Sequence, residues 1–259
     1  MRIFIVASDE PYYLVPYLRL VLERCAPAVV GIAVHAPPRK RFSLQRSLSM
    51  MLLAMLIVPV GQWFRFLGWS GRDLLAKLGL AETDHHLADL GRDFGIPVRQ
   101  ISSVNAPEFV ELMRREQVDV LFHQSPEILR SPVLAAPRVA VLNRHMSPLP
   151  AYRGAWPIFW QLANNEPEVG VTFHIVDDGI DSGAIVTQQR VRREGNESMA
   201  ALVRRLFNLA VPMTCDAFAR LAEGKVEGGT AAGGFVYRTP TPQQIVRYLF
   251  RRPVSSPAS

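Results

Sequence analysis

The sequence predicts an α/β protein with a mostly parallel β-sheet, and two patterns lead to this expectation. Over the first 122 residues, short apolar runs typical of buried strands alternate with amphipathic stretches of helical length. Further along, two strand-like runs flank a glycine-rich turn, which predicts an antiparallel hairpin. Such alternation is typical of parallel strands joined by right-handed crossovers. The 259 residues are enough for one domain with an appendage.

The individual elements follow from these patterns in chain order. Strands are expected at residues 2–7, 28–34, 98–101, 118–122 and 139–142. Helices are expected at residues 13–24, 87–94 and 106–116. The hairpin is expected at residues 169–176 and 184–191, followed by a long helix at 197–222 with Pro212 inside it and a short helix at 243–252.

Composition and charge narrow the class of protein. A hydrophobic fraction of 49% with 20% charged residues is globular and excludes a disordered chain. The net charge of +6 favours anionic partners, such as phosphates, carboxylates, nucleotides or lipid headgroups, without choosing among them. Cys25 and Cys215 fit no metal spacing, so we expect two reduced thiols in a cytoplasmic protein. Asp9 and Glu10 interrupt the first apolar run, which is unlike a signal peptide.

Residues 37–80 form a predicted hydrophobic insertion. Basic residues stand at 39–41, and the run at 47–64 carries no charge. Three hypotheses fit it: a helical insertion packed on the domain or on a second subunit, a surface helix that docks on anionic lipid, and a membrane span. Trp63, Phe64, Phe66 and Trp69 would assist lipid docking. Pro59, Gly61 and Gln62 and two serines weaken the hypothesis of a span.

Asn143 and His145 are the strongest candidates for a functional site. They follow the apolar run at 139–142 and lie two residues apart, so on a strand both side chains face the same way. Binding crevices of open α/β sheets lie outside the carboxyl ends of the strands. Asp181 stands in a glycine-flanked turn. An amide, an imidazole and a carboxylate are the groups that acyl transfer to an amine requires, although strand-end capping explains the first two equally simply.

The segment from residue 142 to 188 resembles the formyltransferase family that uses 10-formyltetrahydrofolate. Motifs of that family occur here in the same order. They are Asn143-Arg144-His145, the loop Ser147-Pro148-Leu149-Pro150, the pair Arg153-Gly154, Gly170-Val171-Thr172, and the run from Asp177 to Gly183. Residues 1–7 and 118–122 fit the family's first and fourth strands. Pro148 departs from the leucine usual in that loop.

The resemblance implies a Rossmann-like fold, 10-formyltetrahydrofolate as the co-substrate, no metal and a primary amine as the acceptor. It implies a catalytic domain at residues 1–224, which includes the insertion, and a short extension at 225–259. The expected catalytic residues are Asn143, protonated His145 and Asp181. Expected contacts to the folate are His123, Gln124, Ser125, Ile128, Leu129, Asp177, Asp178 and Gly179. Expected contacts to the acceptor are Ser147, Pro148, Leu149, Tyr152, Arg153, Gly154 and His174.

Several histidines permit two interpretations. His85 and His86 lack further ligands at metal spacing, so a solvated helix N-terminus is expected there. His123 could line the folate or acceptor pocket or cap its strand. His174 could lie near the site, as in some family members, or be a half-buried strand histidine.

The acceptor and the class of activity stay open at this point. Rival hypotheses are a hydrolase that transfers the formyl group to water, a catalytically silent binding protein, and a membrane-associated interaction protein that uses residues 47–69. Methionyl-tRNA transformylases resemble the core plus a C-terminal barrel, for which the roughly 35 residues after Gly224 are too few. We therefore expect a small-molecule amine, first of all a nucleotide-linked or lipid-linked amino sugar, and no nucleic acid. We also expect a cytoplasmic protein, with membrane or homodimer contact through residues 47–69.

Overall fold

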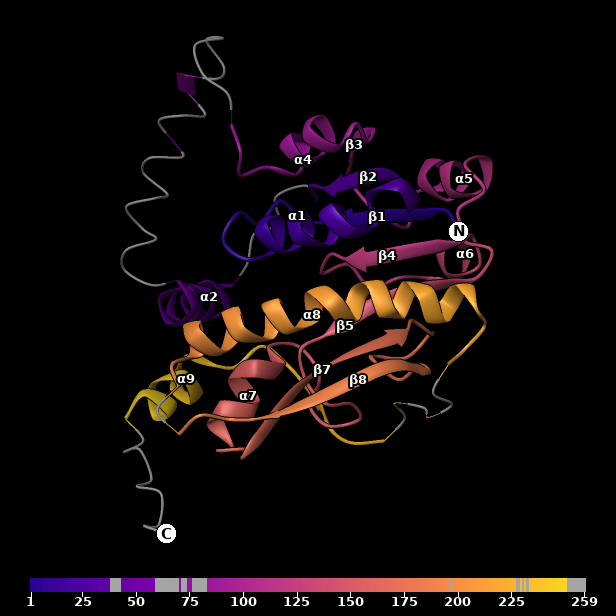
Figure 1. Ribbon diagram of the computed structural model, residues 1–259. Coiled ribbons are helices and arrows are strands. Elements are labelled where there is room, and N and C mark those ends of the chain that lie inside the picture. The colour runs from indigo at the N-terminus through magenta and orange to yellow at the C-terminus, as the bar shows by residue number, and fades with distance from the viewer. Residues whose placement is uncertain are drawn as a thin grey trace.

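A seven-stranded sheet forms the centre of the protein, with the strand order β3-β2-β1-β4-β5-β7-β8. The computed structural model describes residues 1–37, 43–58, 70, 74–75, 83–195, 197–226, 229, 231 and 233–250. Helices cover both faces of the sheet (Figure 1). The predicted α/β architecture with a mostly parallel sheet is therefore confirmed.

Five strands of the sheet are parallel and two are antiparallel. The parallel strands are β1 (Ile3–Ala7), β2 (Val29–His35), β3 (Val98–Ile101), β4 (Val120–Gln124) and β5 (Ala140–His145). The strands β7 (Glu168–Ile175) and β8 (Ile185–Arg192) form the predicted hairpin, and β7 pairs antiparallel with β5. Strand β5 continues past residue 142, where the apolar run ends, and so contains both Asn143 and His145.

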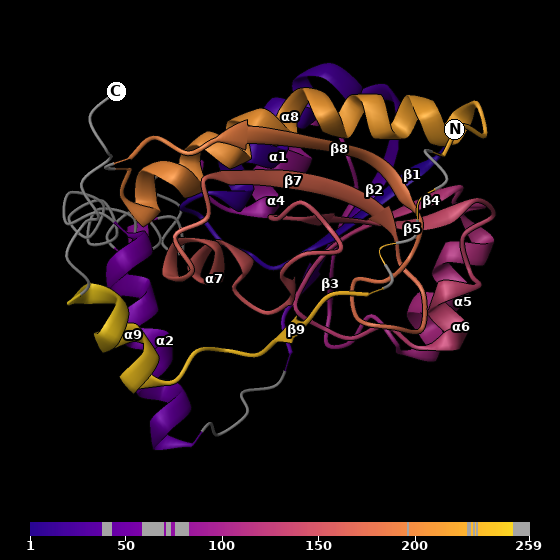
Figure 2. The same ribbon diagram turned by 90° about the horizontal axis from the view of Figure 1, so that it is seen from below.

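Two helical layers enclose the sheet. One face is covered by α1 (Leu14–Cys25), η1 (Ala26–Ala28), α4 (Leu87–Phe94), α7 (Pro157–Ala163) and α8 (Met199–Ala222), and the other by α5 (Pro107–Arg115) and α6 (Ser131–Leu134) (Figure 2). Alternate residues of β1 divide between the layers, because strand side chains point to opposite faces. Ile3 and Ile5 pack with α1 and α8, whereas Phe4 and Val6 pack with α5. Helix α8 continues through Pro212 without a break.

The insertion and the C-terminal extension meet at one end of the molecule. The described part of the insertion forms α2 (Leu44–Ile57), and the extension forms β9 (Val236–Tyr237) and α9 (Pro242–Leu249). Helices α2 and α9 contact each other, and β9 pairs with β6 (Arg153–Gly154) in a second, two-stranded sheet. The extension is thus integrated into the domain. The basic run at 39–41 and the aromatic residues at 63–69 lie outside the described residues.

One expectation is corrected by the fold, and the hypothesis of a membrane span, already weakened by the sequence, gains no support. Among the described helices, none is long and apolar enough to cross a membrane, so no helix supports the hypothesis of a span. The expectation of two reduced thiols is wrong, because Cys25 and Cys215 are joined in a disulfide with Cα atoms 6.7 Å apart. The separation of 190 residues conceals this proximity in the sequence. It arises because α1 and α8 pack against each other.

Glu10 occupies the N-terminus of α1 with its own carboxylate. Its two oxygens accept hydrogen bonds from the N–H groups of Tyr12 at 2.7 Å, Tyr13 at 3.0 Å and Leu14 at 2.8 Å. We expect Glu10→Ala to lower the free energy of unfolding by about 1 to 2 kcal/mol, because these donors lose their acceptor and the helix dipole loses its anion. Chemical denaturation measures the change.

The matched control for this substitution is Glu23→Ala, an exposed carboxylate near the other end of α1. Its loss should change the free energy of unfolding by no more than about 0.5 kcal/mol. Equal effects of the two substitutions would contradict the capping role of Glu10.

Candidate active site

The end of β5 places Asn143 and His145 at the carboxyl edge of the sheet, between two neighbouring strands. Asn143 lies beside His123 of β4 on one side and beside His174 of β7 on the other. His145 lies beside Thr172 of β7. The parallel strands β1, β4 and β5 all end at this edge, where open α/β sheets form their crevice. The strand-end position predicted for both residues is confirmed.

The His145 imidazole is buried, hydrogen-bonded at one nitrogen and close to a carboxylate at the other. Its Nε2–H donates to the main-chain oxygen of Tyr152 at 2.8 Å, and its Nδ1 lies 3.5 Å from Oδ2 of Asp181. Burial lowers the pKa of His145 below its ordinary 6.5, although Asp181 and the bond to Tyr152 act in the opposite direction. In the free protein the ring is therefore neutral near pH 7, with Nδ1 as its acceptor atom. This differs from the expectation that Asp181 keeps the imidazole charged.

Asp181 is held as an ionised carboxylate. The N–H of Gly154 donates to its Oδ2 at 2.7 Å, and its Oδ1 lies 3.5 Å from Nε2 of His174. Burial by itself would raise the pKa of Asp181, but the imidazoles of His174 and His145 and the Gly154 N–H lower it to about 2. Its φ of 46° lies in the left-handed region, which Asp and Asn tolerate better than most residues. The turn predicted from sequence thus aims a carboxylate at His145.

The side chain of Asn143 is fixed from two sides. Its Nδ2 lies 3.3 Å from Nε2 of His174, and its Oδ1 accepts a weak hydrogen bond of 3.4 Å from Gln124. His174 is only 1% exposed and donates from Nδ1 to the main-chain oxygen of Ile175 at 3.0 Å. His174 is therefore buried beside both Asn143 and Asp181, and it positions them from behind.

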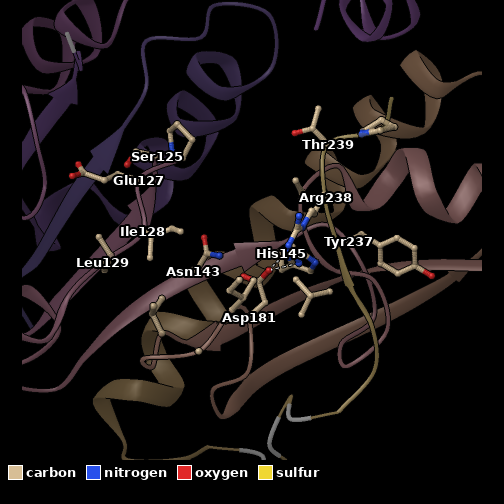
Figure 3. A pocket seen from close by; sticks show the side chains of 18 of the residues that line it. Ser125, Glu127, Ile128, Leu129, Asn143, His145, Asp181, Tyr237, Arg238 and Thr239 are labelled. Atoms are coloured by element: carbon tan, nitrogen blue, oxygen red, sulfur yellow. Dashed lines mark hydrogen bonds and ion pairs between the residues drawn. The ribbon is translucent and has the colours of Figure 1, made fainter. Parts of the chain in front are cut away.

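These side chains open into a pocket of about 830 Å³. Figure 3 shows Asn143, His145 and Asp181 grouped at its centre, with the loop after β4 on one side and the segment at 237–239 on the other. Of the expected folate contacts, six line the pocket: His123, Ser125, Ile128, Leu129, Asp177 and Gly179. Of the expected acceptor contacts, Gly154 does so.

The loop after β4 supplies one wall with a mixed polar and apolar character. His123 is neutral at physiological pH, because burial and the neighbouring His35 lower its pKa to about 4, and its Nε2 lies 3.0 Å from the Ser125 hydroxyl. Glu127, which the sequence analysis missed, accepts hydrogen bonds from the Ser103 hydroxyl at 2.5 Å and the Val104 N–H at 2.6 Å. These bonds lower the pKa of Glu127 despite its partial burial, so the wall keeps one negative charge.

The other wall comes from two segments that the sequence analysis did not connect with the site. Helix α2 contributes Gln45, Arg46 and Ser49, and the extension contributes Tyr237, Arg238 and Thr239. The pairing of β9 with β6 carries the extension to this position, beside Gly154. No sequence signal places these segments, because β6 and β9 pair across 83 positions and α2 and α9 contact each other across nearly two hundred. The pair Arg46 and Arg238 gives this wall its positive charge.

Eight other expected contact residues do not line this pocket, so their contacts to folate or acceptor stay predictions. They are Gln124, Ser147, Pro148, Leu149, Tyr152, Arg153, His174 and Asp178. The loop at 147–152 is held by internal hydrogen bonds: the buried Ser147 hydroxyl donates to the Ala151 oxygen at 2.7 Å, and the Leu149 N–H donates to the Thr172 hydroxyl at 3.1 Å. Arg153 is bound to the main-chain oxygens of Ile180 at 2.7 Å and Gly233 at 2.9 Å.

The two adjacent histidines near α4, His85 and His86, lie outside the pocket. His86 is the N-cap residue of this helix, and its Nδ1 lies 2.8 Å from Oδ2 of Asp9. His85 is 5% exposed, so the expected solvated position is wrong for this residue. Within the described ranges, no group of three or more His, Cys, Asp or Glu residues is arranged to hold a metal ion.

An amide, an imidazole and an ionised carboxylate at the end of a central strand are the kinds of groups that group transfer at a carbonyl carbon uses. The chain belongs to the formyl transferase family, because the model of that family matches residues 81–216, more than half of its length. The family resemblance stated from the motifs is thereby confirmed.

Relatives and solved structures agree with this assignment. The methionyl-tRNA formyltransferase of Chlorobium chlorochromatii (strain CaD3) is 30% identical over 162 residues, which cover 62% of this chain and 52% of that protein. That of Chloroflexus aggregans (strain MD-66 / DSM 9485) is 37% identical over 134 residues, which cover 51% and 43%. The chain spans about half the length of the curated relatives it matches.

Solved structures share the fold at low identity. Glycinamide ribonucleotide transformylase 1 from Symbiobacterium toebii matches with a TM-score of 0.62 and 18% identity, over 88% of this chain and 93% of that one. A sugar N-formyltransferase from a Shewanella species matches with a TM-score of 0.57 and 16% identity, over 92% and 76%. These likenesses establish the Rossmann-like fold of the formyltransferase type.

Proposed function

We propose that the protein transfers a formyl group from 10-formyltetrahydrofolate to the primary amine of a small molecule, most simply an amino sugar linked to a nucleotide or a lipid. The observation that carries the proposal is the convergence of Asn143, His145 and ionised Asp181 on one pocket of about 830 Å³. Membership of the formyl transferase family supports the choice of donor.

The reaction breaks one C–N bond and forms another. The neutral amine attacks the formyl carbon, and the carbonyl oxygen becomes an oxyanion. The Asn143 amide is placed to donate to that oxygen, which stabilises the charge as it develops. Collapse of the intermediate expels N10 of the folate, so the products are the formamide and tetrahydrofolate.

His145 and Asp181 move the proton that this exchange requires. The attacking nitrogen must lose a proton, and the departing N10 must gain one. Neutral His145 can accept the first proton at Nδ1, and the Asp181 carboxylate 3.5 Å away stabilises the imidazolium that forms. The same proton is then delivered to N10, directly or through a water molecule. The Tyr152 oxygen orients the ring throughout by holding Nε2–H.

The positive wall and the capped α1 helix favour a particular kind of acceptor. Arg46 and Arg238 line the pocket and offer charge to a phosphate. In many α/β sheets a phosphate binds instead at the helix N-terminus that follows the first strand. Here Glu10 already accepts the N–H groups at that position. We therefore place a phosphate of the acceptor at the wall formed by α2 and the extension.

Turnover of 10-formyltetrahydrofolate against a panel of acceptors tests the proposal. The panel contains nucleotide-linked amino sugars, glycinamide ribonucleotide, charged initiator tRNA, and water alone. Formamide formation on an amino sugar above the water control is the expected result. Turnover with water alone would show a hydrolase, and turnover only with tRNA would overturn the small-molecule acceptor.

The direction of the His145 pKa gives a further prediction. We expect His145 to titrate below 6.5 in the free protein, since burial dominates its surroundings. Because Asp181 raises this pKa, Asp181→Asn should lower it further. Titration of the imidazole resonances by NMR, with His145→Ala used for assignment, measures both values. A pKa well above 6.5 would instead support an imidazole that is charged from the start.

A further inference from the structure

Helix α2 presents an apolar stripe to solvent. Residues at positions i, i+4, i+7 and i+11 of a helix share one face. Leu44 is 86% exposed and Met55 is 63% exposed, whereas Ser49 and Leu53 on the opposite side are buried. We call this set the α2 stripe; its members are Leu44, Leu48, Met51 and Met55.

Helix α9 adds exposed apolar side chains at the same end of the molecule. Val246, Leu249 and Phe250 are exposed, and Phe250 has 82% of its surface accessible, while Ile245 of this helix is buried. Helices α2 and α9 are in contact, and Figures 1 and 2 both show them side by side, far from α5 and α6. Contiguous exposed apolar groups of this kind mark interaction surfaces.

The net positive charge of the chain comes from the two sequence segments that contain these helices. Residues 37–72 and 228–259 contain no Asp or Glu and hold ten of the 29 Lys and Arg residues. The rest of the chain has 19 basic and 23 acidic residues, so it is weakly negative. The whole positive excess of the protein thus belongs to the two sequence segments that contain α2 and α9.

We propose that the surface formed by the α2 stripe, by Val246 and Leu249 of α9 and by Phe250, which follows α9, docks on an anionic lipid bilayer. Exposed leucine, methionine and phenylalanine can enter the headgroup region, and the exposed Arg247 on α9, together with the positive charge of the two segments, would attract acidic headgroups. A second copy of the chain fits less well. A two-fold interface would place α2 and α9, which contain Arg46 and Arg247 and no acidic residue, against the same helices of the second copy, and like charges repel.

Docking would connect the bilayer with the active-site pocket. Helix α2 contributes to both the docking surface and the pocket. Its stripe is exposed to solvent, whereas Gln45, Arg46 and Ser49 line the pocket. The parallel strands also end toward the side where α2 and α9 lie (Figure 1). A docked protein would therefore receive an amine carried on a lipid at the mouth of its pocket. This extension to the acceptor rests on the proposed formyl transfer, whereas docking itself does not.

Co-sedimentation of the full chain with vesicles tests docking. We expect binding to vesicles that contain phosphatidylglycerol, little binding to pure phosphatidylcholine, and weaker binding as salt is raised. Met51→Asp combined with Met55→Asp should reduce binding at least tenfold. The matched control is Val139→Asp, an exposed apolar residue that precedes β5 at the opposite end of the sheet.

Charge is tested in the same assay. Arg247→Glu on α9 should weaken binding severalfold, and Arg114→Glu on α5 should leave it unchanged. Equal binding by the stripe variant and its control would overturn the proposal, as would no binding of the unaltered protein to any vesicle. A dimer in ultracentrifugation that the stripe variant dissociates, without vesicle binding, would assign the surface to a second copy and also overturn it.

Activity then separates docking from the proposed function. Formylation of an amino-sugar glycolipid in phosphatidylglycerol vesicles is compared with that of the corresponding soluble amino sugar. The stripe variant should lose activity toward the glycolipid and keep it toward the soluble amine, because Met51 and Met55 do not line the pocket. Vesicle binding without formylation of any amine would contradict the proposed function and leave docking intact. Equal glycolipid activity of variant and control would contradict docking and leave the function intact.

Discussion

Replacing His145 by alanine is expected to lower kcat by about 10²–10⁴-fold, the range that one positioned proton-transfer group contributes. Asp181→Asn should lower it by a comparable factor, because the amide cannot stabilise the imidazolium. The double variant should be about as slow as the slower single variant, since residues that act as a unit show non-additive losses. Single-turnover formylation of the best amine in the panel measures all three rates.

The structure makes these substitutions interpretable. Asparagine tolerates the positive φ at position 181, and its oxygen can still accept the Gly154 N–H, so the turn should persist. Asp178→Asn is the matched control, because Asp178 is exposed in the same turn and does not line the pocket. Its rate should be unchanged. Two modest single losses that multiply in the double variant would show that His145 and Asp181 do not act together.

Asn143→Ala is expected to lower kcat by about 10²–10³-fold, the effect of removing one donor from an oxyanion site. The Asn143 amide is oriented by His174 and Gln124, so alanine removes the donor without replacing it. An interaction made only in the transition state lowers kcat and kcat/KM equally and leaves KM almost unchanged. Steady-state kinetics with both substrates varied measures the two parameters.

Two comparisons sharpen the test on Asn143. Asn143→Asp should be at least as slow as the alanine variant, because a carboxylate would repel the developing oxyanion. Gln100→Ala removes an exposed side-chain amide from β3, outside the pocket, and should leave kcat unchanged. A large rise in KM with normal kcat would assign Asn143 to binding of the ground state instead.

The sheet and the residues at its edge were predictable because local patterns encode them. Apolar runs that alternate with helical spacing predict crossovers, and a period of two places Asn143 and His145 on the same side of β5. Asp181 was identified through its glycine-framed turn and the family motif. In the structure this turn brings its carboxylate to 3.5 Å from both His145 and His174.

The loop at 147–152 shows that a sequence motif alone does not say which side chains face the pocket. Its residues are expected to touch the acceptor, and that stays a prediction; in the structure Ser147 and Leu149 are buried, and the Tyr152 oxygen accepts a hydrogen bond from His145. A sequence motif can reflect either a backbone shape that the site needs or a side-chain contact to the substrate. Packing decides between the two, because it determines whether the side chains face the pocket or the core.

The sequence by itself determined the α/β sheet, the family and the catalytic candidates, because each depends on residues close together in the chain. Only the tertiary structure decided that Cys25 meets Cys215, that β9 pairs with β6, and that α2 and the extension complete the pocket. It also gives the direction of the His145 pKa, which burial lowers although the nearby carboxylate acts in the opposite direction. These features depend on which segments, distant in sequence, pack against each other in the folded protein. Local hydrophobic periods and motif spacings carry no information about such contacts.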